Sequence, residues 1–171
     1  MKSKLKFTQQ DLDETDWLAK VLREIDNIDA EYVNAVTDEI YKIQPYFLTV
    51  LLGYSYDVSG EELEEIMKIY FIIWEYFRLK PNIKKMKVTE TFFDQIQAKN
   101  IGMLKYSEGE ADKTEKIKIY AGDIQKLKSK SLWTAILFRY NNRIVISKMN
   151  SETRAAVLIG IKCFIECFEK I

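Results

Sequence analysis

The clearest indication of enzymatic chemistry in this chain is a group of carboxylates between residues 61 and 65. It comprises Glu61, Glu62, Glu64 and Glu65. Mg²⁺ prefers oxygen ligands and is commonly held by one or two carboxylates together with substrate phosphates. If the segment is helical, Glu61 and Glu65 lie one turn apart and share a face. We therefore take Glu61 and Glu65 as candidate metal ligands.

The pattern Glu62-x-x-Glu65 resembles half of a known paired motif. Helical nucleotide pyrophosphohydrolases of the MazG type bind magnesium through E-x-x-E on one helix and E-x-x-D on the next, but no E-x-x-D occurs downstream here. Glu62 also has a structural explanation, because Ser59 and Glu62 have the spacing of a helix capping box. A magnesium-dependent nucleotide hydrolase is therefore our second alternative function, and we assign no catalytic residue.

The composition excludes several other chemistries. The chain has no histidine, which rules out Ser-His-Asp and Cys-His catalysis, histidine-containing zinc sites and Glu-x-x-His di-iron sites. Neither glycine-rich phosphate-binding pattern, G-x-G-x-x-G or G-x-x-x-x-G-K-S/T, is present. The two cysteines, Cys163 and Cys167, lie in an apolar segment where a thiol is usually inert. We expect no cofactor and lean against an enzyme.

Basic residues suggest a different function, nucleic-acid binding. Five of them fall within ten residues: Arg78, Lys80, Lys84, Lys85 and Lys87. Such a cluster could contact phosphates, so a Lys-rich nucleic-acid-binding face is our first alternative. Residues 1–77 hold seven Lys/Arg and sixteen Asp/Glu, a balance of −9, whereas residues 78–148 hold sixteen and seven, a balance of +9. The two halves either pair within the fold or form a charged partner surface.

A proline interrupts the most apolar part of the chain. The stripe Val33, Val36, Ile40, Ile43, Phe47, Val50 and Tyr54 stays in helical phase through Pro45. Either the helix kinks at 41–45, or it stops and Pro45 starts the next helix. We favour a kinked, central, buried helix. Four nearby tyrosines are candidates for lining a pocket there: Tyr41, Tyr46, Tyr54 and Tyr56.

Near the C-terminus, small residues recur at helical spacing. They are Ala156, Gly160, Cys163 and Cys167. A line of small side chains lets another helix approach closely, so this is a candidate helix–helix interface, either internal or with a second subunit. Asn100 falls on the inward side of its own predicted helix. It needs hydrogen-bond partners there, and either pins a neighbouring helix or contacts a ligand.

The elements that must position these residues are predicted to be helices. The chain of 171 residues is 47% apolar and has only six Gly and two Pro, which argues against a many-stranded fold. We predict one all-α domain, residues 1–171, forming an irregular bundle of about six helices around the Pro45–Tyr54 segment. Residues 107–123 are the best candidate for a mobile loop. Residues 132–149 form either a helix with a connector or a hairpin through Asn141-Asn142.

These observations favour a small, cytoplasmic, bacterial-type protein-interaction or regulatory domain. The partner would be another protein or a second copy in a homodimer, with no membrane role. The first residues lack the apolar core of a secretory signal, and the longest apolar stretches are too short to cross a bilayer.

Overall fold

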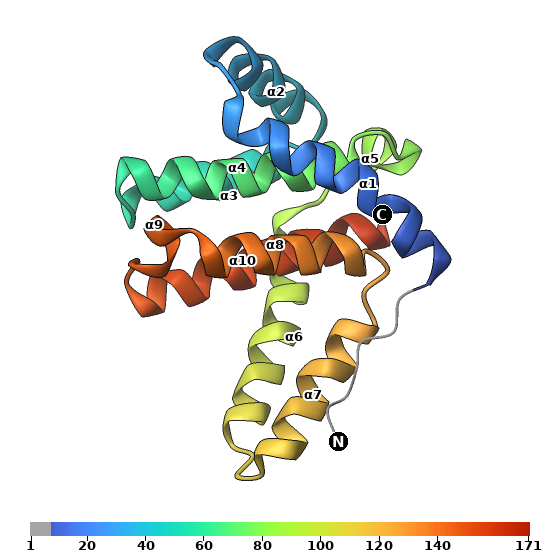
Figure 1. Cartoon of the computed structure of the whole chain (residues 1–171), viewed down its shortest axis with the longest axis vertical. Coiled ribbons are helices and arrows are strands. Elements are labelled where there is room, and N and C mark those ends of the chain that lie inside the picture. The colour runs from blue at the N-terminus through green and yellow to red at the C-terminus, as the bar shows by residue number, and fades with distance from the viewer. Residues whose placement is uncertain (1–7) are drawn as a thin grey trace.

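The computed structural model describes residues 8–171, and helices are its only regular elements in that range (Figure 1). The all-α prediction is therefore confirmed. These residues form ten α-helices rather than about six, because short helices follow the breaks at Pro45, Pro81 and Arg143. The part of the N-terminal segment before Thr8 lies outside the described residues. The α-helices, with 3₁₀ turns at 25–27 and 54–56, are α1 (Gln9–Glu24), α2 (Ala30–Ile43), α3 (Pro45–Gly53), α4 (Gly60–Phe77), α5 (Pro81–Lys85), α6 (Glu90–Glu108), α7 (Lys113–Gln125), α8 (Lys130–Asn142), α9 (Ile144–Ser147) and α10 (Ser151–Lys170).

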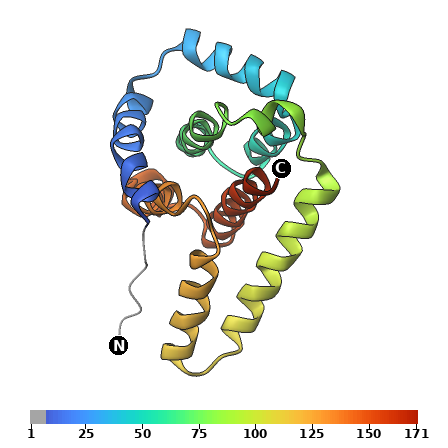
Figure 2. The ribbon, with the colours of Figure 1, turned by 90° about the vertical axis from the view of Figure 1, so that its right-hand side faces the viewer.

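The centre of the fold is formed by α4 and α10, not by the segment after Pro45. Every residue from Ile69 to Trp74 on α4 is fully buried, and every residue from Gly160 to Phe168 on α10 is buried. By contrast, Leu52 on α3 is 53% exposed. Figure 2 shows α4 and α10 seen nearly end-on, with the other helices arranged around them. The prediction of a central helix at 45–54 is wrong, because the segments at 69–74 and 160–168 bury side chains on all sides.

At Pro45 the helix stops and a new one begins, so the favoured kink is also wrong. Gln44 leaves helical geometry with φ −135° and ψ 67°, and Pro45 occupies the first turn of α3. The Gln44 side chain is buried and forms hydrogen bonds with three backbone groups of residues 83–88. Its Nε2 donates to the carbonyls of Ile83 (2.7 Å) and Met86 (2.6 Å), and its Oε1 accepts from Val88 N (2.9 Å). These bonds fasten the α2–α3 break to the segment that connects α4 and α6.

The segment predicted as a mobile loop, 107–123, and the segment with two alternative predictions, 132–149, are both mainly helical. Residues 107–123 complete α6 and form most of α7, so the mobile-loop prediction is wrong; Asp112 caps α7 through the N–H of Thr114 (2.7 Å). Residues 132–149 form most of α8, then α9, so the hairpin alternative is wrong. In both figures α6 and α7 reach away from the helical body side by side (Figures 1 and 2). Over residues 8–171, none of the helices combines the length and apolar character needed to cross a membrane.

Several helix starts agree with the sequence signals. Ser59 and Glu62 form the predicted capping box, with Ser59 N donating to Glu62 (2.7 Å) and Glu62 N donating to Ser59 (3.2 Å). Thr89 caps α6 and Asn150 caps α10, and both are residue types that commonly occupy this position. A second capping box, formed by Thr8 and Asp11, starts α1.

Candidate functional site

The two candidate metal ligands on α4 have different surroundings. Glu61 is exposed, whereas the Glu65 side chain is only 13% exposed and lies among cations. Arg139 Nη2 approaches Glu65 at 3.3 Å, and Arg143 Nε approaches it at 3.8 Å. Glu65 is thus already neutralised by arginines of α8 and its C-terminal end. Within residues 8–171, no three Cys, Asp or Glu side chains gather as a metal centre would require.

The same ion pairs connect the acidic and basic parts of the sequence. Arg139 Nη2 also contacts Asp26 Oδ1 at 2.6 Å, and Arg143 pairs with Asp26. Arg139 is buried, and its hydrogen bond to Asp26 holds the pKa of that carboxyl below its ordinary value. Asp26 and Glu65 belong to the acidic part of the chain and both arginines to the basic part. Here the two halves pair within the fold.

The predicted basic cluster is only partly available to a partner. Arg78 donates to Glu75 (2.8 Å) and lies 3.6 Å from Glu39. The Lys80 ammonium lies over the Tyr76 and Phe77 rings, at 4.6 and 4.7 Å from their centroids. Three lysines remain exposed on or just after α5: Lys84, Lys85 and Lys87. Nucleic-acid binding through these three residues stays a prediction.

The four tyrosines near Pro45 are not brought together. Tyr41 and Tyr56 are 67% and 91% exposed, whereas Tyr46 packs edge-on against Phe93. Tyr54 faces inward, and its hydroxyl lies 3.0 Å from that of Tyr70. The structure therefore divides these residues between the surface and the core rather than around one cavity.

The line of small residues on α10 is used inside the chain, except at its first member. Ala156 is exposed, while Gly160, Cys163 and Cys167 are buried. A Cβ at Gly160 would collide with the Tyr54 hydroxyl, so glycine is what admits that ring. Burial, with a smaller contribution from nearby Glu166, raises the pKa of the Cys163 thiol to about 12, and burial raises that of Cys167 equally. Both thiols are thus protonated and unreactive at neutral pH.

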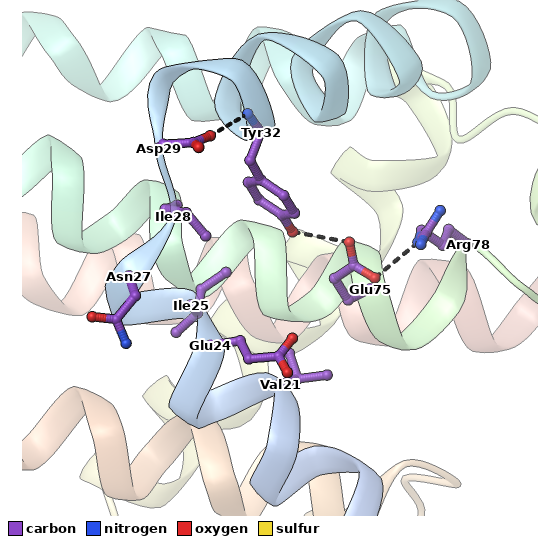
Figure 3. Close-up of a pocket in the computed structure, with 9 residues that line it drawn as sticks. All are labelled: Val21, Glu24, Ile25, Asn27, Ile28, Asp29, Tyr32, Glu75 and Arg78. Atoms are coloured by element: carbon purple, nitrogen blue, oxygen red, sulfur yellow. Dashed lines mark hydrogen bonds and ion pairs between the residues drawn. The ribbon is translucent and has the colours of Figure 1, made fainter.

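One recess, shown in Figure 3, is a cleft between the end of α1 and helices α2 and α4. Tyr32 donates to Glu75 Oε1 (2.9 Å), and Arg78 Nε donates to Glu75 Oε2 (2.8 Å) (Figure 3). Burial, followed by the charge of Glu75, raises the pKa of Tyr32 well above its ordinary value, so its hydroxyl remains a donor. These polar groups already satisfy one another, and the network fastens α2 onto α4.

A second polar cluster is buried where α6, α7 and α10 meet. The Lys162 ammonium on α10 donates to Asp123 Oδ2 on α7 (2.7 Å), to Glu166 Oε1 (2.8 Å), and to Asn100 Oδ1 on α6. Asn100 Nδ2 in turn donates to Glu166 Oε2 (3.0 Å). The prediction that Asn100 pins a neighbouring helix is confirmed. Lys162, Asp123 and Glu166 were not predicted as site residues, although the i, i+4 pair of Lys162 and Glu166 in an otherwise apolar helix indicates a buried ion pair.

Both members of the central ion pair are charged at neutral pH. Burial alone would lower the pKa of Lys162, but hydrogen bonds to Asp123 and Glu166 outweigh it and raise that pKa. Burial alone would raise the pKa of Glu166, but the hydrogen bond and charge of Lys162, together with the hydrogen bond from Asn100 and the charge of Lys99, outweigh it and lower that pKa. Lys99, which is half exposed, lies 3.5 Å from Glu166. The cluster therefore contains two cations and two carboxylates.

Above this cluster lies a pocket of about 330 Å³ between α6, α7, α8 and α10. Its polar lining comes chiefly from Asn100, Asp123 and Lys162, and the rest is mainly aliphatic and aromatic. Trp133 is buried in this wall, and its indole Nε1 has no hydrogen-bond partner among residues 8–171. The full lining consists of Asn100, Met103, Leu104, Tyr120, Asp123, Ile124, Trp133, Leu137, Ala155, Leu158, Ile159 and Lys162. An apolar pocket with a few polar groups at one place is the usual form of a small-molecule site.

Comparison with known proteins adds no assignment. No family model, no curated protein and no solved structure matches this chain.

Proposed function

We propose that this chain is a regulatory helical domain that binds a small apolar molecule in the α6–α7–α8–α10 pocket and acts through a protein partner. The observation that carries the proposal is the pocket itself, which is apolar except for the buried Asn100–Asp123–Lys162 cluster. Four helices contribute to its wall, so an occupant would contact all four. Such contacts can alter the position of α7, which projects from the helical body with α6 (Figure 2).

The other two functions have less support from the geometry. Glu65, a candidate metal ligand, is occupied by Arg139 and Arg143. In the basic cluster, Arg78 forms an ion pair with Glu75, and the Lys80 ammonium lies over aromatic rings. The pocket, by contrast, provides apolar surface and a volume that none of residues 8–171 fills.

Two neighbouring alanines on α10 allow a matched test. Ala155 lines the pocket, whereas Ala156 does not, and both are exposed, so tryptophan at either position avoids the core. The probe is phenylnaphthylamine, a neutral dye that becomes fluorescent in apolar surroundings. We expect the wild type and Ala156→Trp to bind the dye with the same affinity, and Ala155→Trp to lose binding. Equal binding by all three proteins would show that the dye occupies another surface and would refute the proposal.

The proposed protein partner, including a second copy of the chain, is tested by measuring the mass of the intact assembly. Native mass spectrometry of gently purified protein reports both the oligomeric state and any bound molecule. A homodimer would need a surface other than Gly160, Cys163 and Cys167, since these residues are buried within one chain. Ala156 is the exposed member of that line, so Ala156→Glu would dissociate a homodimer whose interface includes this part of α10 and would leave a dimer formed elsewhere intact.

A further inference from the structure

A polar pocket, separate from the α6–α7–α8–α10 pocket, lies where the start of α1, the end of α4 and the α7–α8 connection meet. Its volume is about 450 Å³. The start of α8 lies beside the start of α1 (Figure 1), and Ser131 Oγ donates to the carbonyl of Asp11 (2.7 Å). The lining of the pocket includes four lysines: Lys80, Lys126, Lys128 and Lys130. A basic lining of this kind suits an anionic ligand.

The four lysines of this pocket lack ion-pair partners. None of the ion pairs among residues 8–171 involves any of them. Burial lowers the pKa of Lys80, and the like charge of Lys128 lowers it further. The carboxylates of Glu14 and Glu169 only partly oppose these effects. An anion beside Lys80 and Lys128 would offset their mutual repulsion.

The carboxylates near the pocket are already engaged in hydrogen bonds. Asp11 belongs to the capping box of α1. Glu14 accepts from the Tyr76 hydroxyl, and Glu169 accepts from Ser129 N (2.6 Å). Four lysines and three carboxylates leave a balance of +1. The protein's own acidic groups therefore do not neutralise the pocket.

The start of α8 adds hydrogen-bond donors to the basic lining. Ser129 is the N-cap of this 13-residue helix, but its side chain makes no capping hydrogen bond. The backbone N–H groups of residues 130–132, in the first turn, have no acceptor among residues 8–171. Because the helix dipole is positive at this end, free N–H groups there favour an anion.

An unpartnered hydroxyl in the pocket wall also points to a ligand. Ser129 lines the pocket and is 1% exposed, and its Oγ has no hydrogen-bond partner among residues 8–171. The nearby Tyr76 hydroxyl donates to Glu14 instead. A buried hydroxyl without a partner is costly, and an oxygen of a ligand would supply the missing acceptor.

We propose that this pocket binds the phosphate group of a small phosphorylated molecule, held between the four lysines and the start of α8. Phosphate carries several acceptor oxygens, so it can bind ammonium groups, helix N–H groups and the Ser129 hydroxyl together. Since a cavity of about 150 Å³ accommodates benzene, the pocket has room for a diphosphate.

Calorimetric titration with inorganic pyrophosphate at low salt and neutral pH tests the site. We expect saturable binding by the wild type, and at least about tenfold weaker binding when Lys128→Gln and Lys130→Gln are combined. The control combines Lys113→Gln and Lys148→Gln, which remove the same charge at the start of α7 and just after α9, away from the pocket (Figure 1). It should bind like the wild type. Equal binding by the two double variants would overturn the site, as would the absence of binding by the wild type.

Ser129→Ala distinguishes a specific phosphate site from a general attraction to lysines. We expect at least about threefold weaker pyrophosphate binding, because the hydroxyl donor is lost, and no loss of stability in urea, because the hydroxyl has no partner within residues 8–171. Unchanged affinity would overturn the placement of the phosphate at the start of α8. A single-stranded oligonucleotide that displaces pyrophosphate and binds more tightly would overturn the small-molecule class.

Discussion

The buried Lys162 cluster yields the most specific prediction, which concerns the change Lys162→Met. Methionine keeps most of the volume of the side chain but removes the charge and all three donors. Asp123 and Glu166, whose side chains are 8% and 6% exposed, would then lose their main partner. Asn100 would lose the donor to its Oδ1. The variant thus leaves carboxylates buried without compensation.

The expected loss of stability follows from these contacts. Removing one partner of a buried ion pair costs about 3–5 kcal/mol. Lys99 still lies 3.5 Å from Glu166 and compensates part of its charge, but it is about half exposed. We therefore expect the low end, about 3 kcal/mol. With an m-value of about 2 kcal/mol/M, the urea midpoint would fall by about 1.5 M.

The pH dependence of the stability difference between the wild type and Lys162→Met distinguishes an effect of charge from an effect of side-chain packing. In the wild type the pKa of Glu166 is lowered from 4.5, so its contribution is complete above that value and is lost as pH falls through the folded pKa. The pKa of Lys162 is raised from 10.5, so its contribution is lost only as pH rises through a still higher folded value. In the variant, burial raises the pKa of Glu166, and protonation relieves the unpaired charge. The stability difference should therefore be largest at neutral pH. It should begin to shrink above pH 4.5, as pH falls through the raised pKa of Glu166 in the variant, and should shrink further below 4.5 as the wild type loses its own stabilisation.

Urea unfolding followed by circular dichroism at neutral and acidic pH is the assay. Lys170→Met, an exposed change of the same type on α10, is the control and should be close to neutral. A loss that stays constant from neutral to acidic pH would show that Lys162 acts by packing alone. A loss near zero would refute the assignment of Lys162 as the centre of a buried charged cluster.

Three further changes test other parts of the structure. Gly160→Ala should cost about 1–3 kcal/mol in urea unfolding, because its Cβ collides with the Tyr54 hydroxyl; adding Tyr54→Phe should recover part of that loss, and equal losses in the single and double variants would contradict the clash. Glu65→Ala should lower the thermal unfolding midpoint, because the buried Arg139 loses its ion pair with Glu65. Glu61→Ala, at an exposed position, should leave the midpoint unchanged, and equal effects of the two changes would contradict a structural role specific to Glu65. Gln44→Ala should lower the free energy of unfolding by about 2 kcal/mol or more, because it leaves buried backbone groups at 83–88 unpaired. Amide hydrogen exchange should accelerate at Val88, and unchanged exchange there would contradict the Gln44 contact.

Local features of the chain were readable from the sequence because their causes are local. The capping box at Ser59 and Glu62 depends on residues within one turn of each other at the start of α4. The all-α class followed from helical periodicity and the scarcity of glycine and proline. The inward position of Asn100 likewise followed from its phase in α6.

The predictions that were wrong concern segments whose structure depends on contacts with residues distant in the sequence. Both outcomes at Pro45 keep the apolar stripe in phase, and the choice between them is linked to Gln44, whose side chain bonds residues about 40 positions away. The burial of 69–74 on every side depends on the surrounding helices, so α4 took the central place expected of 45–54. Residues 107–123 have weak apolar periodicity, yet they form a helix held to α10 by Asp123 and Lys162.

The sequence alone therefore determined the class of secondary structure, the start of α4 and the absence of histidine-dependent chemistry. Only the tertiary structure decided which polar side chains meet, because Asn100, Asp123 and Lys162 come from three helices and no local pattern connects them. It also decided that Glu65 faces Arg139, 74 residues away. A pocket arises from the packing of helices that are distant in sequence, so the site proposed here has no signature in the linear chain.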